Sequence, residues 1–97
     1  MLTGKQRSFL KKEAHGVDPI LQIGKNGVTD NFITQVNDAL EARELVKVNV
    51  LNNSFLDTKE VANDVANKTG AEFVQSIGNK FVLYRESEEN KTIKLPK

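Results

Sequence analysis

The residues best suited to bind a ligand are Gly24, Lys25, Asn26 and Gly27, which separate a short apolar run from an amphipathic segment. Glycine lacks a Cβ, so two glycines let the backbone turn with positive φ and come close to a bound group. The segment that follows is predicted to be a helix, whose first N–H groups and positive dipole end favour anions, and Lys25 adds a positive charge. The pattern indicates a phosphate-binding loop, although a plain turn between a strand and a helix explains G-x-x-G alone equally well.

The spacing of this loop favours a nucleic-acid backbone over a free nucleotide. It matches neither the P-loop, G-x-x-x-x-G-K-[ST], nor the dinucleotide-binding pattern G-x-G-x-x-G. A G-x-x-G loop does clamp nucleotide backbones in KH modules. In those modules the loop joins two helices, whereas here it follows an expected strand.

A second candidate surface lies on the first predicted helix, residues 3–14. Its apolar side chains fall in one arc of a helical wheel, and the opposite arc holds basic side chains without an acidic one. These basic residues are Lys5, Arg7, Lys11 and Lys12. Residues 1–28 hold five basic and two acidic side chains, a net charge of +3, whereas residues 29–97 have a net charge of −2. A charged helix face is usually only solvated, but a single sign of charge over two turns favours an anion-binding face.

The chain offers little for catalysis or metal binding. It has no cysteine and one histidine, His15, which cannot build a typical zinc site and lies just past the end of the first helix. Glu86, Glu88 and Glu89 cluster in a polar segment, where no cavity would raise the pKa of a carboxylate for acid–base work. We therefore expect no catalytic residue, no metal and no cofactor. Base stacking is not expected either, because five of the six aromatic residues lie at core positions of the apolar pattern.

Length and composition indicate one globular domain. The 97 residues are 38% hydrophobic and 28% charged. No apolar run approaches the roughly 20 residues that cross a bilayer, and the N-terminus lacks the apolar stretch of a secretory signal. We expect a cytoplasmic, monomeric protein with no membrane attachment.

The elements that would position the candidate residues alternate between helix and strand. Helices are predicted over residues 3–14 and 30–43, and a third begins after Asp57 and ends at Gly70. Strands are predicted over residues 19–23, 45–51, 72–77 and 80–85, with residues 52–54 ending the second strand. This order predicts an α/β fold, αβαβαββ, in which three helices accompany a mixed four-stranded sheet. The domain would span residues 1–85, and residues 86–97 would form a loosely held polar tail whose removal changes stability little.

With these residues in place, the chain resembles the CRM domain (chloroplast RNA splicing and ribosome maturation) in its single-domain, bacterial YhbY-like form, over about residues 2–85. The markers are Leu2-Thr3-Gly4-Lys5-Gln6-Arg7, Pro19-Ile20-Leu21-Gln22-Ile23-Gly24-Lys25-Asn26-Gly27, Glu44-Leu45-Val46-Lys47-Val48, Thr69-Gly70-Ala71-Glu72-Phe73-Val74-Gln75, Ile77-Gly78 and Leu83-Tyr84-Arg85. The resemblance implies a fold similar to the C-terminal domain of bacterial translation initiation factor three. It also implies RNA binding at the G-x-x-G loop, association of bacterial members with precursors of the large ribosomal subunit, and a use in group II intron splicing in plant organelles.

We therefore expect a non-catalytic RNA-binding domain that contacts structured ribosomal RNA through phosphate and sugar and acts in assembly of the large (50S) subunit. The expected RNA-binding residues are Gly24, Lys25, Asn26, Gly27, Lys5, Arg7, Lys11 and Lys12. The alternative is a protein-interaction adaptor that docks on a ribosomal or assembly protein through the acidic region 29–97. DNA binding is a weaker option, because no recognition-helix motif is visible.

Overall fold

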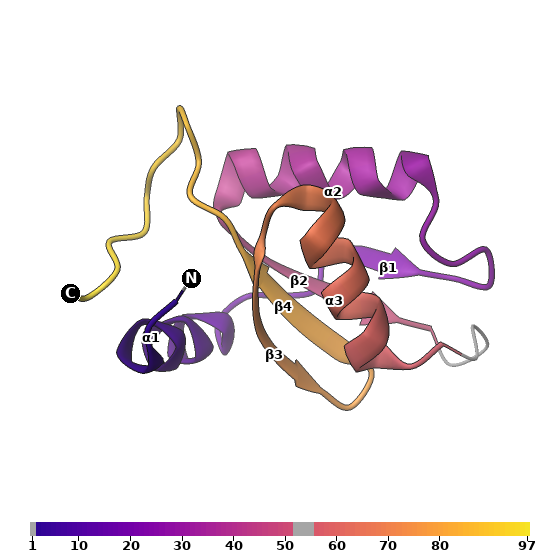
Figure 1. Ribbon diagram of the computed structural model, residues 1–97, viewed down its shortest axis with the longest axis horizontal. Helices are drawn as coiled ribbons and strands as arrows, with labels where there is room; N and C mark the ends of the chain where they lie inside the picture. The colour runs from indigo at the N-terminus through magenta and orange to yellow at the C-terminus, as the bar shows by residue number, and fades with distance from the viewer. Residues whose placement is uncertain (1, 52–55) are drawn as a thin grey trace.

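The helices and strands alternate as the sequence predicts. The computed structural model describes residues 2–51 and 56–97. The helices are α1 (Gly4–Ala14), α2 (Asp30–Arg43) and α3 (Thr58–Thr69), and the strands are β1 (Leu21–Ile23), β2 (Leu45–Val50), β3 (Glu72–Ile77) and β4 (Lys80–Tyr84). This order confirms the predicted αβαβαββ arrangement for the described part of the chain (Figure 1). The predicted break at residues 52–54 and Phe55 lie outside the described residues.

Each helix begins after a residue whose side-chain oxygen accepts a hydrogen bond from a backbone N–H group of the first turn. Thr3 and Gln6 form a capping box at α1, with Gln6 N donating to Thr3 Oγ1 at 3.1 Å. Thr29 Oγ1 accepts from Phe32 N at 3.0 Å at α2, and Asp57 Oδ1 accepts from Glu60 N at 2.9 Å at α3. These contacts satisfy donors that the helix itself leaves unpaired, so the caps fix where the helices start.

The strands form one mixed sheet with the order β1-β2-β4-β3. β1 pairs with β2 in parallel, whereas the β2–β4 and β3–β4 pairs are antiparallel. α2 and α3 cover one face of this sheet, where Val46, Val48 and Val50 of β2 and Phe81 and Leu83 of β4 are buried. The apolar alternation along β2 therefore marks the face on which the larger core forms.

α1 packs on the opposite face and covers it only in part. Leu10 and Ala14 of α1 are buried with Leu45, Val74 and Tyr84 in a second cluster. These strand residues lie at one end of the sheet, so α1 lies beside that end. The β1–α2 loop lies at the other end of the long axis of the molecule, whose extents are 39 × 26 × 22 Å (Figure 1).

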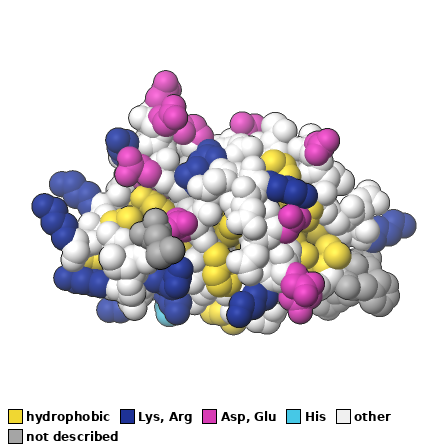
Figure 2. Space-filling model, viewed as in Figure 1, with side chains coloured by type: hydrophobic (Ala, Val, Ile, Leu, Met, Phe, Trp, Pro, Cys, Tyr) yellow, Lys and Arg dark blue, Asp and Glu magenta, His cyan; other side chains and the backbone are white. Residues whose placement is uncertain are grey.

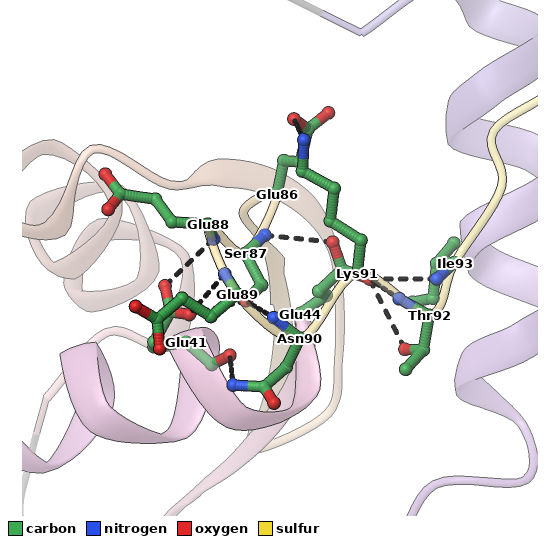
Figure 3. Close-up of polar contacts among 10 residues, drawn as sticks. All are labelled: Glu41, Glu44, Glu86, Ser87, Glu88, Glu89, Asn90, Lys91, Thr92 and Ile93. Carbon is green, nitrogen blue, oxygen red and sulfur yellow. Dashed lines mark hydrogen bonds and ion pairs between the residues drawn. The ribbon is translucent and has the colours of Figure 1, made fainter.

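The C-terminal segment differs from the predicted loose tail. Residues 86–97 have no helix or strand, and the bend that they form carries acidic side chains at the top of the view (Figure 2). The segment is nevertheless anchored to the end of α2 by two carboxylates (Figure 3). The Glu41 carboxylate accepts from Ser87 Oγ at 2.6 Å and from the backbone N–H groups of Glu88 and Glu89, both at 3.1 Å. Sequence analysis missed this because hydrogen bonds from the backbone leave no periodic pattern of side chains.

Glu44 holds the same segment from a fully buried position. Its carboxylate accepts from the backbone N–H groups of Ser87, Thr92 and Ile93 at 2.9, 2.7 and 2.8 Å. Burial raises the pKa of Glu44, but these hydrogen bonds outweigh burial and leave the pKa below its ordinary value. Further along, Ile93 and Leu95 pack against the α1 cluster. The tail therefore closes the end of α2 and part of the smaller core.

Candidate nucleic-acid interface

Residues 24–27 form a tight turn between β1 and α2. Gly27 N donates to Gly24 O at 3.0 Å, which is the hydrogen bond of a β-turn, and the central residues Lys25 and Asn26 are exposed. Gly27 has φ +71°, in the left-handed region, whereas Gly24 has an ordinary backbone conformation. The expectation that both glycines use positive φ is thus wrong for Gly24. The absence of a Cβ at Gly24 therefore matters only because it leaves room in the hollow beside the turn.

A hollow of about 220 Å³ opens beside this turn. It is lined by residues 24–27 together with Gln22 before the turn and Thr29, Asn31 and Gln35 after it, among others. None of the described residues that line it is acidic. Backbone amide groups, polar side chains and one exposed ammonium group therefore face a space that a phosphate and its sugar could occupy.

The N-terminus of α2 contributes less to anion binding than the sequence analysis assumes. Thr29 Oγ1 already accepts one N–H of the first turn, from Phe32. Asp30 is the first residue of α2 and is exposed, so its carboxylate lies at the positive end of the helix dipole. A phosphate placed there would be repelled by Asp30. The turn itself and Lys25 are consequently the stronger anion-binding groups.

The basic face predicted for α1 is present with one exception. Lys5, Lys11 and Lys12 are exposed, and Lys and Arg side chains gather over α1 and the nearby end of the chain (Figure 2). Arg7 is half-buried, and its Nε is buried without a hydrogen-bond partner among the described residues. Arg7 therefore lies at the margin of this face instead of in the middle of it.

The structure does not bring the two predicted surfaces together. α1 lies at the left of the molecule and the β1–α2 loop at the right, at opposite ends of its longest axis (Figure 1). Lys25 and the α1 lysines cannot neutralise the same phosphate. They would contact separate parts of a ligand that spans the molecule.

Arg85 has an architectural role, although it belongs to one of the sequence markers. Its guanidinium donates to Asn37 Oδ1 and to Thr69 O, both at 2.7 Å, and so ties α2 to the end of α3. Sequence reasoning gave no binding role to Lys47 and Asn49, which are partly exposed and alternate with the buried valines of β2. The alternation along β2 is the sequence signal that places both side chains on the face opposite the larger core.

No group of three or more histidine, acidic or cysteine side chains in residues 2–51 and 56–97 is arranged to hold a metal ion. Within the same residues no helix is long and apolar enough to span a membrane.

A family model, curated proteins and a solved structure are similar to this chain. The model of the CRS1 / YhbY (CRM) domain matches residues 2–85. The probable RNA-binding protein YqeI of Bacillus subtilis is 54% identical over 96 residues, which cover 99% of this chain and all of that protein. An RNA-binding protein of Haemophilus influenzae is 40% identical over 96 residues, covering 99% of this chain and 96% of the relative. The solution structure of the hypothetical protein SAV1595 from Staphylococcus aureus superposes with a TM-score of 0.83 at 55% identity, covering 99% of this chain and 100% of that one.

Proposed function

The chain belongs to the CRS1 / YhbY (CRM) domain family, and from this we propose that it is a non-catalytic RNA-binding protein that holds the RNA backbone at residues 24–27. Relatives that align over nearly the whole chain are named as RNA-binding proteins, which supports RNA as the ligand. The observation that carries the proposal is the exposed turn with Lys25 and Asn26 at its tip beside an open hollow without acidic lining residues.

The chemistry of the turn suits phosphate and sugar. Lys25 supplies a point charge, the Asn26 amide can donate to a phosphate or accept from a 2′-hydroxyl, and Gly24 leaves room beside the backbone. Contacts of this kind position RNA without reading its sequence. The exposed lysines of α1 add a second, equally non-specific contact at the other end of the molecule.

The RNA that we propose is ribosomal RNA in a precursor of the large subunit, bound by a cytoplasmic monomer during 50S assembly. This finer proposal follows from the family resemblance and is tested in cells. RNA crosslinked to the protein should map to precursors of large-subunit ribosomal RNA. Crosslinks confined to messenger or transfer RNA would contradict the ribosomal part of the proposal while leaving RNA binding intact.

Replacing Lys25 tests the site. Lys25→Ala removes an exposed charge, so its free energy of unfolding should stay within about 0.5 kcal/mol of that of the original protein. RNA binding should weaken by about 1.5–3 kcal/mol, and the salt dependence of log affinity should become shallower by roughly 0.7. Lys59→Ala is the matched control, because Lys59 is likewise an exposed lysine but does not line the hollow beside residues 24–27.

Two results would count against this assignment. Equal RNA affinity of the Lys25 and Lys59 variants would reduce residues 24–27 to a simple turn. A salt slope near zero for the original protein would contradict phosphate contacts altogether and favour the adaptor that docks on a ribosomal or assembly protein.

A further inference from the structure

On one face of the sheet, the part beyond α1 is covered by no helix of the described residues. α2 and α3 cover the other face completely enough to bury Val46, Val48 and Val50. On the α1 side, Leu45 at the start of β2 is buried under α1, whereas Lys47 and Asn49 remain partly exposed. The uncovered part of this face therefore begins between Leu45 and Lys47 along β2.

The strand register places six side chains on this uncovered part. Gln22 pairs with Asn49, Asn49 with Lys80, and Lys80 with Ile77, so one row crosses all four strands. In the next row Lys47 pairs with Val82 and Val82 with Gln75. Directly opposed residues share a face. We call the exposed and half-exposed members the sheet surface: Gln22, Lys47, Asn49, Gln75, Ile77 and Lys80.

Two hollows mark this surface. One of about 140 Å³ is lined by Lys47, Gln75, Ile77, Lys80 and Val82. The other, of about 330 Å³, is lined by residues 19–22 and Asn49. No acidic residue of the described chain lines either hollow. Ile77, which lines the first hollow, is 61% exposed, more than any other large apolar side chain of the described residues.

The sheet surface is continuous with the loop. Gln22 lines both the second hollow and the hollow beside residues 24–27. Along β2, Leu45 lies under α1, Lys47 and Asn49 follow on the sheet surface, and Val50 pairs with Ile23, the residue before the loop. The sheet surface thus lies between α1 and the loop, the two regions at opposite ends of the molecule.

We propose that the sheet surface binds unpaired RNA and joins the loop and the basic face of α1 into one path. This inference rests on the proposed RNA-binding function. Lys47 and Lys80 match phosphates in charge, and the amides of Gln22, Asn49 and Gln75 carry both donors and acceptors for base edges. The Oδ1 of Asn49, which is buried and has no hydrogen-bond partner among the described residues, is an acceptor that a base amino group would satisfy once the side chain turns outward.

Unpaired RNA fits this surface better than a duplex does. The deep major groove of an A-form helix keeps side chains from base edges, whereas unstacked bases expose both edges and faces. Ile77 offers an apolar contact to a base face in a surface that has no aromatic residue among its six members. The path between two separate phosphate contacts also suits a flexible strand that can follow the sheet.

The experiment compares two double variants that remove the same charge. Lys47→Gln with Lys80→Gln changes the sheet surface, and Lys59→Gln with Lys68→Gln changes α3 on the far side of the sheet. Each is titrated with a labelled single-stranded RNA of about 16 nucleotides and with the same sequence as a duplex. The sheet variant should bind the single strand about ten-fold or more weakly than the α3 variant does. Ile77→Ser should weaken single-strand binding and leave duplex binding unchanged.

The outcomes separate this inference from the proposed function. If the original protein and Lys25→Ala differ in affinity while the two double variants agree, the sheet surface is not a binding surface and the loop assignment stands. If the original protein binds neither RNA, both proposals fail. Equal losses for single strand and duplex would overturn the preference for unpaired RNA. Thermal melts check the fold, and Lys80→Gln alone, at an exposed side chain, replaces the double variant if Lys47→Gln unfolds the protein.

Discussion

Gly24→Ala separates the fold of the loop from its function. An alanine Cβ at this position would meet one described atom within 4 Å, Leu51 Cδ1 at 3.8 Å, which is an ordinary van der Waals contact. The backbone of Gly24 is not in the left-handed region, so alanine fits without strain. Because alanine restricts the unfolded chain more than glycine does, we expect the variant to be as stable as the original or more stable by about 0.4–1 kcal/mol.

The affinity of Gly24→Ala for RNA should fall, although its stability should not. Gly24 lines the hollow beside the turn, and a methyl group there would keep a phosphate from the backbone. Loss of one charge-assisted hydrogen bond costs about 1.5–3 kcal/mol, which corresponds to roughly 10- to 150-fold in the dissociation constant. The variant would thus melt at the same or a higher temperature and bind RNA more weakly.

Fluorescence anisotropy with a labelled single-stranded RNA measures the affinity, and a thermal melt measures the stability. Gly16→Ala is the control, because its backbone is also outside the left-handed region and its Cβ would lie 3.9 Å from Glu13 O. If Gly24 and Lys25 hold the same phosphate, the double variant should lose less affinity than the two single variants together. Equal RNA affinity of Gly24→Ala and Gly16→Ala would refute close approach of the RNA backbone at this turn.

Three further predictions concern α2 and the tail. Asp30→Asn should strengthen RNA binding by a few-fold in the same titration, because it removes the carboxylate beside the loop; unchanged affinity would mean that no phosphate comes near the start of α2. Deleting residues 86–97 should lower the melting temperature by roughly 10 °C, since the buried Glu44 carboxylate would lose its hydrogen bonds; an unchanged melt would show that the tail contacts do not stabilise the domain. Hydrogen bonds from the Ser87 hydroxyl and then from the Glu88 and Glu89 N–H groups lower the pKa of Glu41 from 4.5 to about 2. A lowered pKa stabilises the fold above pH 4.5, and this stabilisation is lost as pH falls toward 2, so melts of Glu41→Gln should vary less with pH over that window.

The fold could be predicted because its signals are local. Thr29 and Asp57 cap helices by contacts within three residues, and Gly70 ends α3 with φ +70°. Each of these helix boundaries is therefore determined by a few neighbouring residues. Alternation along β2 likewise distinguishes its two faces without knowledge of the partner strands.

The geometry of the candidate sites could be predicted only in part, because it is non-local. Residues 24–27 were recognisable from glycine spacing, but nothing in a helical wheel shows that α1 and this loop lie at opposite ends of the sheet. The tail contacts join Glu44 to Thr92 and Ile93 across almost half the sequence. Such contacts depend on where α2 ends, and Glu44, with φ +66°, adopts a backbone conformation that its residue type does not favour.

Along α2, the contacts that hold the C-terminal segment and the loop proposed to bind RNA lie at opposite ends. At its C-terminal end Glu41 and Glu44 hold residues 86–97, and midway Asn37 accepts from Arg85. At its N-terminal end α2 begins with Asp30, shortly after the loop at residues 24–27. A helix of 14 residues spans about 21 Å, so the two ends are too far apart for direct electrostatic competition at ordinary salt. Changes at Glu41 or Glu44 should consequently move the melting temperature and leave the RNA affinity of the folded protein unchanged, whereas Gly24→Ala and Lys25→Ala should lower the RNA affinity without lowering the melting temperature.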